Sequence, residues 1–340
     1  MNLDILRHLC ALSGVSGQED AVRGAIIEAL PDGARYIVDR LGNLIVTKDA
    51  REPKPQKHTA LFAHMDEVGM IVTHVAPGGF LLFSHVGGID RRAYLGKRVF
   101  VGKNEIAGVI GVKPVHLLDD GEKRKTPKSD ALCIDIGARS DVEAAERVQL
   151  GDRVCFAPHF KTFGDGFVKA KAIDDRVGCA ILLDLLQQDL PYAMTAVFSC
   201  QEEVGGAAGA AAFALVPDYA IVVETTTAND LPGVDGAKRV CALGGGAVVP
   251  FMDRGTVYPM ELYMRTMALA AAHGIPAQTK TMIAGGNDAR VIHTGGCGVP
   301  TLAISVPCRY LHSPSVVMQI SDAEAAQSLI YHVWEELCHP

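Results

Sequence analysis

Four short apolar runs in this chain each lead, within a few residues, to a histidine or an acidic residue. The runs are 59–63, 194–199, 219–223 and 301–305, and they lead in turn to His64, Glu202–Glu203, Glu224 and His312. Apolar runs of this length are typical of strands that are buried on both faces. The carboxyl ends of parallel strands meet at one edge of a sheet, where α/β proteins bind their ligands. The sequence therefore predicts that these side chains lie close together.

Helical patterns fill much of the sequence around these runs. They cover residues 3–11, 19–30, 174–188, 205–215, 259–273 and 322–338. Strands that alternate with helices predict an α/β fold, with a mainly parallel sheet sandwiched by helices. Ser16 and Glu19 have the spacing of a capping box for the second of these helices. We expect Asp174 and Asp175 in the first turn of the third.

The character of the sequence changes between residues 68 and 162. Glycine is frequent there, the apolar runs are short, and helical periodicity is missing. This pattern is typical of a β-rich module with turns. We therefore expect one α/β domain, made of residues 1–67 and 163–340, that is interrupted by an inserted β-rich module of residues 68–162.

Charge and cysteine usage exclude several classes of protein. The net charge of −7 gives no reason to expect nucleic acid or an anionic membrane as a partner. The first residues lack the basic and then apolar layout of a signal peptide. The nine cysteines include no CxxC pair, which indicates reduced thiols and a cytoplasmic protein.

The residue types at the strand ends indicate a metal site. Imidazole and carboxylate ligands without a thiolate suit Zn, Co or Mn. Two histidines and three or four carboxylates, with Asp174 among them, exceed the four ligands of one tetrahedral ion. A pair of ions roughly 3.5–4 Å apart, bridged by a carboxylate, fits better. One carboxylate then remains to take a proton from water.

Each of these residues also fits a plain structural role when it is considered alone. A histidine after a strand commonly forms ordinary hydrogen bonds, and adjacent glutamates such as Glu202 and Glu203 commonly face solvent. Asp174 and Asp175 could simply complement a helix dipole. The prediction of a site therefore depends on the repeated pattern of a strand end followed by a ligand.

Six motifs stand out along the chain, namely AHMDEVGM (63–70), KAIDDRVG (171–178), CQEEVGG (200–206), VVETT (222–226), AGGNDA (284–289) and PCRYLHSP (307–314). Together they resemble the glutamyl and deblocking aminopeptidase family, which includes the large tetrahedral aminopeptidases. The resemblance implies an aminopeptidase that removes N-terminal residues from peptides with two divalent ions, most commonly Zn or Co, with Mn also compatible. It also implies that residues 68–162 form a β-barrel-like dimerisation domain, and that the chain forms a homo-oligomer built from dimers, up to a dodecamer.

The resemblance also implies a ligand set. His64 and Glu224 would bind one ion, Glu203 and His312 the other, and Asp174 would bridge the two. The family usually has an aspartate at the position of Glu224, which is one methylene longer.

Two further roles follow from the same resemblance. Glu202 would be the general base, and Asp66 would hold the second ring nitrogen of His64. Asn287, Asp288 and Arg309 are candidates for the substrate pocket.

Three other functions stay open at this point. Another amide hydrolase on the same scaffold, such as a deacylase or carboxypeptidase, would act on blocked peptides or on C-termini. A glycoside hydrolase would use Glu202 and Glu203, although adjacent residues on an extended chain point to opposite sides. A non-catalytic scaffold would lack ligands, whereas each expected ligand position here holds a competent residue.

Overall fold

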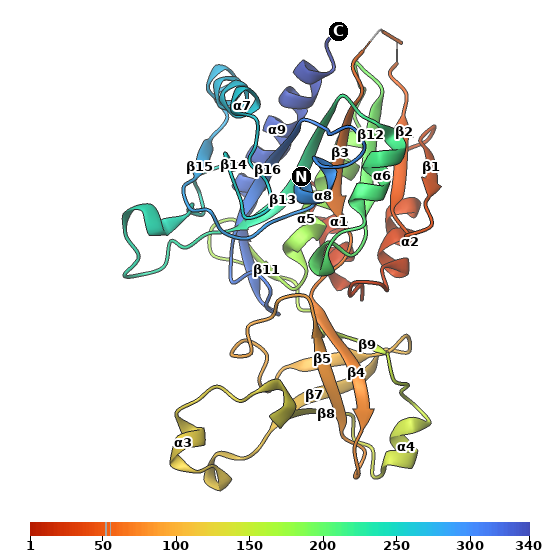
Figure 1. The fold of residues 1–340 in the computed structure, drawn as a ribbon, viewed down its shortest axis with the longest axis vertical. Helices are drawn as coiled ribbons and strands as arrows, with labels where there is room; N and C mark the ends of the chain where they lie inside the picture. Colours follow the sequence, from red (N-terminus) through yellow and green to blue (C-terminus); the bar gives the residue numbers. More distant parts are fainter. Residues whose placement is uncertain (52, 55) are drawn as a thin grey trace.

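The computed structural model describes residues 1–51, 53–54 and 56–340. Figure 1 shows an α/β domain with a smaller β-rich module attached at one end. The two are connected where the chain leaves β3 (Thr59–His64) and where it returns to β10 (Lys161–Phe163).

An eleven-stranded mixed sheet forms the centre of the α/β domain. Its four middle strands are parallel neighbours in the order β12-β3-β13-β16, with bounds Met194–Ser199, Thr59–His64, Tyr219–Thr227 and Thr301–Arg309. These are the four apolar runs of the sequence, so the predicted parallel core is confirmed. The flanking strands β1 (Arg35–Val38), β2 (Leu44–Lys48), β17 (Val316–Gln319), β11 (Phe167–Ala170) and β10 (Lys161–Phe163) are antiparallel additions, and β14 (Ala247–Pro250) and β15 (Ala277–Lys280) lie off this path.

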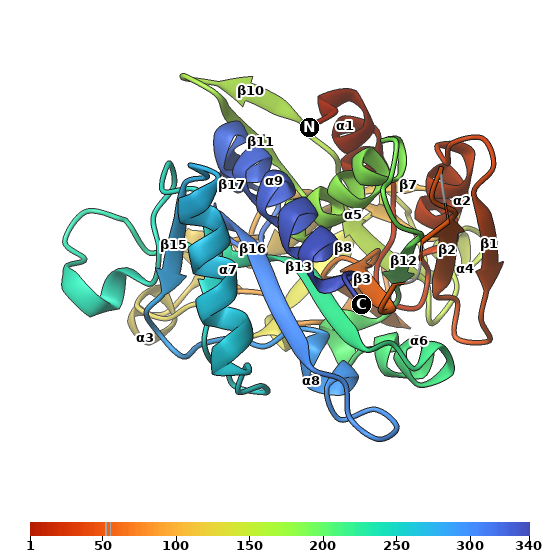
Figure 2. The same cartoon turned by 90° about the horizontal axis from the view of Figure 1, so that it is seen from above.

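Helices cover both faces of the sheet (Figure 2). On one face lie α1 (Leu3–Ala11), α2 (Asp20–Glu28), α5 (Ile173–Leu186), α7 (Met260–Ala272) and α9 (Ile320–Leu337), and on the other lie α6 (Ala208–Leu215) and α8 (Ala289–Ile292). Successive strand residues point to opposite faces. In β3, therefore, Leu61 and Ala63 belong to the first core and Ala60 and Phe62 to the second. Burial on both faces explains the uninterrupted apolar runs.

The inserted module is a closed six-stranded barrel in the order β4-β5-β8-β7-β6-β9. Its strands are Gly69–Val75, Leu81–Val86, Leu132–Asp135, Ile106–Val112, Arg98–Val101 and Arg153–Phe156. A separate core fills the barrel, with Met70, Phe83 and Phe156 among its members. The expected β-barrel is thus confirmed, whereas the limits 68 and 162 and a role in dimerisation stay predictions. Short helices lie outside the barrel strands, namely α3 (Asp120–Lys123), α4 (Asp141–Ala145), η1 (Val115–Leu117) and η2 (Ser129–Ala131).

One local prediction is wrong. The side chain of Ser16 does not cap α2, whose N-cap is Glu19 without a side-chain hydrogen bond; its hydroxyl donates instead to Asp66. Asp174 and Asp175 lie in the first turn of α5, as expected, but their backbone dihedrals are not helical. No helix in the described part of the chain is long and apolar enough to span a membrane.

Candidate active site

The parallel strands deliver the predicted residues to one edge of the sheet. His64 is the last residue of β3 and lies opposite Ser199, the last residue of β12. Glu224 is within β13, opposite Ser305 of β16. The strand registers therefore align the four strand ends, and the residues that follow these strands meet above them.

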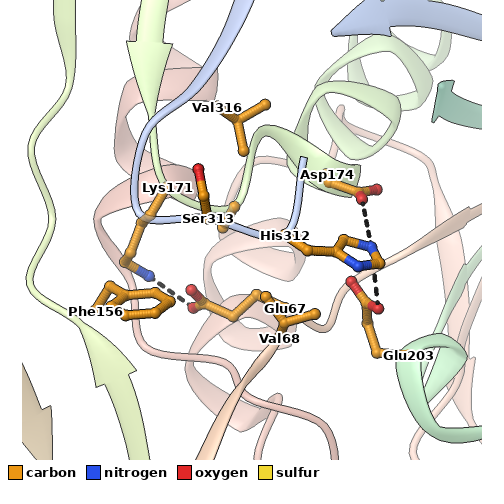
Figure 3. Close-up of a pocket in the computed structure, with 10 residues that line it drawn as sticks. Glu67, Val68, Phe156, Lys171, Asp174, Glu203, His312, Ser313 and Val316 are labelled. Carbon is orange, nitrogen blue, oxygen red and sulfur yellow. Dashed lines mark hydrogen bonds and ion pairs between the residues drawn. The ribbon is translucent and has the colours of Figure 1, made fainter. Parts of the chain in front are cut away.

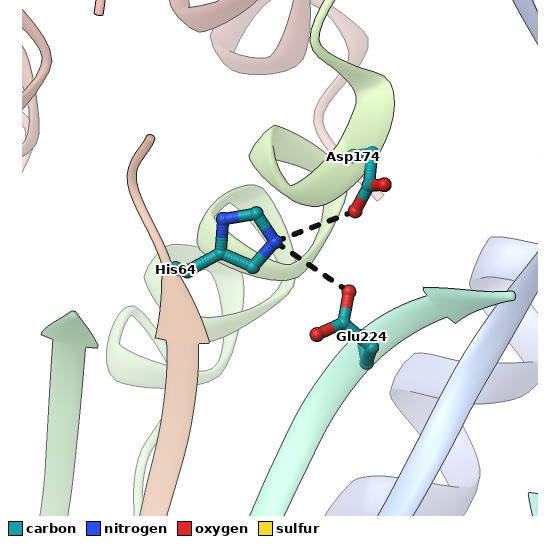
Figure 4. A group of neighbouring side chains, drawn as sticks. All are labelled: His64, Asp174 and Glu224. Carbon is teal, nitrogen blue, oxygen red and sulfur yellow. Dashed lines mark ion pairs between the residues drawn. The ribbon is translucent and has the colours of Figure 1, made fainter. Parts of the chain in front are cut away.

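The first cluster contains His64, Asp174 and Glu224, and it is buried (Figure 4). Nε2 of His64 lies 3.4 Å from Oδ1 of Asp174 and 3.6 Å from Oε1 of Glu224. The same Glu224 oxygen accepts a 2.9 Å hydrogen bond from the backbone amide of Thr225. The longer side chain of Glu224 is thus folded back onto its own strand and still reaches the histidine.

The second cluster shares Asp174 with the first and adds Glu203 and His312 (Figure 3). Nε2 of His312 lies 3.3 Å from Oδ2 of Asp174 and 3.4 Å from Oε2 of Glu203. Asp174 therefore presents one oxygen to each histidine. This arrangement is what a carboxylate between two cations requires.

Asp66 contacts the backbone of the turn that carries Glu202 and Glu203 and lies next to His64. It is fully buried and accepts hydrogen bonds from the hydroxyl of Ser16 at 2.6 Å and from the backbone amides of Glu202 at 3.0 Å and Glu203 at 3.2 Å. Its Oδ1 lies 3.3 Å from Nδ1 of His64, without the alignment of a hydrogen bond. Asp66 thus ties the turn that carries the two glutamates to the histidine at the end of β3.

Glu202 and Glu203 lie in the short 3₁₀ turn η3 (Glu202–Val204), just after β12. Oxygen atoms of both glutamates and a ring nitrogen of His64 all lie within 4.8 Å of one another. Glu19 steadies this turn, because its carboxylate accepts the backbone amide of Gln201 at 3.2 Å. Glu202 belongs to neither His64–Asp174–Glu224 nor Asp174–Glu203–His312, but with His64 and Glu203 it forms a third group that could hold a metal ion.

Burial and crowding of negative charge raise the proton affinity of the glutamates. Burial and the neighbouring Asp174 raise the pKa of Glu203 to about 8. Burial raises the pKa of Glu224 to about 7, although His64 opposes the shift. Burial, assisted by Glu224, raises the pKa of Glu202 well above its usual range.

The histidines respond to the same crowding in the opposite way. Burial alone would lower the pKa of His312, but Asp174 and Glu203 outweigh it and raise that pKa to about 9. Burial likewise lowers the pKa of His64. Glu224 and Asp174 outweigh this effect and raise that pKa well above its usual value. The acidic side chains of the site thus lie so close together that the binding of positive charge, as protons or as metal cations, is favourable.

The donor set fits two divalent cations. Each histidine faces two carboxylates, the two groups share only Asp174, and no cysteine belongs to either group. Buried carboxylates are costly unless positive charge compensates them. Imidazole and carboxylate donors suit divalent ions of the Zn, Co and Mn kind. A cation in each group would replace the protons that these side chains otherwise attract.

Sequence reasoning missed the buried charges behind the site. Nζ of Lys171 lies 2.6 Å from Oε1 of Glu67, and Nε of Arg176 donates to the carbonyl of Met65 at 2.7 Å. Asp175 accepts the backbone amide of His64 at 3.3 Å. These contacts fix the end of β3 that carries His64 and Asp66. The only sequence signal was the density of charges in KAIDDR, which is unusual next to apolar helices.

The three pocket candidates have different positions. Arg309 pairs with Asp230 at 2.6 Å, so its guanidinium is already occupied. Asp288 is buried and accepts a 2.6 Å hydrogen bond from the hydroxyl of Ser199. Of the three, only Asn287 lines a cavity next to the site.

Two cavities open from the clusters. The inner chamber has a volume of about 400 Å³ and is lined by Asp174, Glu202, Glu203, Glu224–Thr227, Asn229, Val240, Lys280, Met282, Ala284–Gly286, Leu311 and His312. The outer groove is more open, has a volume of about 540 Å³, and is lined by Gly88, Glu202–Gly205, Arg254, Gly255, Gly285–Asn287, Arg290 and His312. They share Glu202, Glu203 and His312, so the site lies where the two cavities meet.

Known proteins resemble this chain over almost its whole length. A lysyl aminopeptidase of Pyrococcus furiosus is 30% identical, with 98% of this chain and 97% of the relative covered. The solved TET1 peptidase of Pyrococcus horikoshii, described as assembling into a tetrahedron or a large octahedral shell, is 32% identical with a TM-score of 0.85 and 99% of each chain covered. A solved protein of Thermotoga maritima named endoglucanase is 37% identical, with a TM-score of 0.79 and 97% and 96% covered.

The family comparison agrees with these individual matches. Residues 42–329 match the model of the M42 glutamyl aminopeptidase family. This range contains each of the seven predicted site residues, from His64 to His312. The chain therefore belongs to the M42 glutamyl aminopeptidase family and is a metal-dependent enzyme that hydrolyses peptide bonds.

Proposed function

We propose that this aminopeptidase releases N-terminal residues with two divalent ions, one held by His64 and Glu224 and the other by Glu203 and His312. The observation that carries the proposal is the position of Asp174, whose two carboxylate oxygens lie 3.4 and 3.3 Å from the two histidines. Zn and Co are the ions we expect, and Mn also suits these donors.

The chain's own residues position the reactants and move the proton. When bound, the two ions supply Lewis acidity that activates water and polarises the scissile carbonyl. Glu202 lines both cavities next to the two clusters, so its carboxylate can take a proton from water and return it to the leaving amine. Asp66 keeps the backbone of Glu202 and the ring of His64 in place.

The inner chamber suits the side chain of the first residue, because it is the more enclosed of the two cavities and contains Glu224. Apart from His312 of the second cluster, Lys280 is the one cationic side chain among its described lining residues. Its Nζ donates to the carbonyl of Ala284 at 2.7 Å, which directs the amine along the chamber wall. A lysine favours an acidic or polar first residue over the basic one that the name of the P. furiosus relative indicates.

A glycoside hydrolase is the second candidate, because the T. maritima relative is named endoglucanase. Glycosidase carboxylates stand roughly 5–9.5 Å apart on either side of a sugar ring. Oxygens of Glu202 and Glu203 lie within 4.8 Å of each other, and Glu203 also faces His312. This spacing and the histidine neighbours favour peptide hydrolysis.

We further propose that the protein is cytoplasmic and that it forms a homo-oligomer. The TET1 relative is described as assembling into a tetrahedron or a large octahedral shell, and the barrel offers a compact second body through which dimers would form, up to a dodecamer. Each of the nine cysteines is free of a disulfide, which suits a reducing compartment.

Metal analysis of the purified chain, coupled to a panel of free and N-terminally blocked peptides, tests the proposal. We expect two ions per chain and cleavage of free peptides only; preferential cleavage of blocked peptides would instead identify a deacylase. Glu202→Gln should retain both ions but lose ~10²–10⁴-fold in rate. The exposed Glu146→Gln is the matched control. A Glu202→Gln rate near that of the wild type would contradict the base assignment.

A further inference from the structure

Two arginines line the outer groove together with the glutamates of the site. Arg254 and Arg290 both border the cavity that is also lined by Glu202 and Glu203. Neither arginine forms an ion pair with a carboxylate of the described residues. Arginine presents a planar fork of donors that matches a carboxylate, so this wall is complementary to a negatively charged ligand.

The loop that carries Arg254 is held in a defined shape. The buried carboxylate of Asp253 accepts the backbone amides of Gly255 at 2.7 Å and Thr256 at 2.8 Å. It also accepts the hydroxyl of Tyr258 at 2.6 Å. The backbone amide of Arg254 donates to Gly285 at 2.9 Å, next to the entrance shared by both cavities. The carboxylate of Asp253 therefore forms its hydrogen bonds within its own turn, and the guanidinium of Arg254 remains available to a ligand in the groove.

The side chain of Arg290 lies across the same loop. A Cβ atom at Gly255 would come within 2.7 Å of Cγ and Cδ of Arg290, so the glycine makes room for this side chain. Nη2 of Arg290 is 3.4 Å from the carbonyl of Gly205, in the turn that follows Glu203. Gly255 thus places the Arg290 stem beside Arg254, and Gly205 fixes its far end near the reacting groups.

We propose that Arg254 and Arg290 form a subsite that binds a carboxylate of the peptide on the far side of the scissile bond. The inference rests on the proposed function: with the first residue in the inner chamber, the remainder of the peptide leaves through the outer groove. The carboxylate is either the C-terminus of a short peptide or an acidic side chain after the first residue. In both cases, the two guanidinium groups raise kcat/KM for such peptides, mainly through KM.

Paired peptides with the same first residue distinguish the two sources. One pair is a dipeptide with a free C-terminus and its C-terminal amide. The other is a tetrapeptide amide with aspartate or asparagine in second place. The ratio of kcat/KM within each pair is measured for the wild type, for Arg254→Gln/Arg290→Gln, for Arg290→Lys, and for Arg40→Gln as an exposed control away from the groove.

We expect the wild type to favour the charged member of at least one pair, by about 5-fold for each guanidinium engaged. The double variant should bring that ratio to about one, Arg290→Lys should keep part of it, and Arg40→Gln all of it. A ratio of one in the wild type for both pairs, or a ratio that survives in the double variant, overturns the inference. Cleavage of neutral free peptides at the same time would leave the proposed function intact. Calorimetry of the same peptides with Glu202→Gln gives the ratio without turnover.

Discussion

Replacement of Asp66 by asparagine tests how the site is held. Each carboxylate oxygen of Asp66 accepts a backbone amide, Oδ1 that of Glu202 at 3.0 Å and Oδ2 that of Glu203 at 3.2 Å. An amide has one accepting oxygen, so one of these two positions must receive an NH₂ group. The NH₂ group is better tolerated at Oδ2, because the hydroxyl of Ser16 can turn and accept from it.

The expected losses of stability and of metal affinity follow from this orientation of the asparagine amide. The amide of Glu203 then loses its acceptor in a partly buried position, which costs about 1–3 kcal/mol of unfolding free energy. The oxygen that remains 3.3 Å from Nδ1 of His64 no longer carries a charge. Substitutions of such supporting groups typically reduce metal affinity or activity by roughly 10–100-fold. We therefore expect Asp66→Asn to weaken the ion at His64 and to slow peptide cleavage by similar factors.

Two measurements check this prediction. Urea unfolding in the presence of chelator gives the stability of the protein without the contribution of metal, and competition with a chromophoric chelator gives the affinity of each ion. Ser16→Ala is the matched control, because it removes one donor at 2.6 Å but leaves the carboxylate and its charge. Wild-type metal affinity and activity in Asp66→Asn would refute the reasoning, and so would an equal loss of affinity in Ser16→Ala.

Three other perturbations give separate tests. Chelation should abolish turnover and lower Tm, because an ion at 100 times its Kd contributes about 2.7 kcal/mol; calorimetry with and without added Zn, Co or Mn checks this. Hydrogen bonds from Arg309 hold the pKa of Asp230 below its usual range, so the pair's contribution is complete above the unfolded pKa and is lost as the pH falls through the folded one. The stability difference between wild type and Asp230→Asn should therefore shrink below roughly pH 4, as measured by urea unfolding at several pH values. Trp334→Ala should cost about 3–5 kcal/mol of unfolding free energy, because Trp334 is fully buried in α9, and unchanged urea unfolding would contradict this.

The strand ends could be predicted because burial on both faces leaves a clear signal in the sequence. The runs that lead to His64 and Glu224 contain almost only apolar residues, and each is a central strand of the sheet. The parallel order then requires that their carboxyl ends meet, whichever helices connect them. Neither step depends on the details of a loop.

The supporting contacts could not be predicted, because they connect residues far apart in the chain. Ser16 and Glu19 have the spacing of a helix cap, but their side chains contact Asp66 and the backbone of Gln201 instead. A local pattern favours the local interpretation, and only the packing of the N-terminal segment against the turn after β12 reverses it. The helical pattern of 174–188 likewise does not predict the non-helical backbone of Asp174 and Asp175 in the first turn of α5.

The positions of the buried charged residues explain why the carboxylates of this site are available to metal cations and are not paired with the protein's own cationic side chains. Lys171 and Arg176 are both buried within the same region, yet their contacts lie on the rear side. Lys171 binds Glu67 and the carbonyl of Leu12, each at 2.6 Å, and Arg176 binds the carbonyls of Met65 and Leu9 at 2.7 and 2.6 Å. The protein's own cations are thus used to fix the strand end, and neither of them compensates the carboxylates on the cavity side. Burial raises the pKa of Glu203 and Glu224, and divalent ions would replace the protons that these carboxylates otherwise attract.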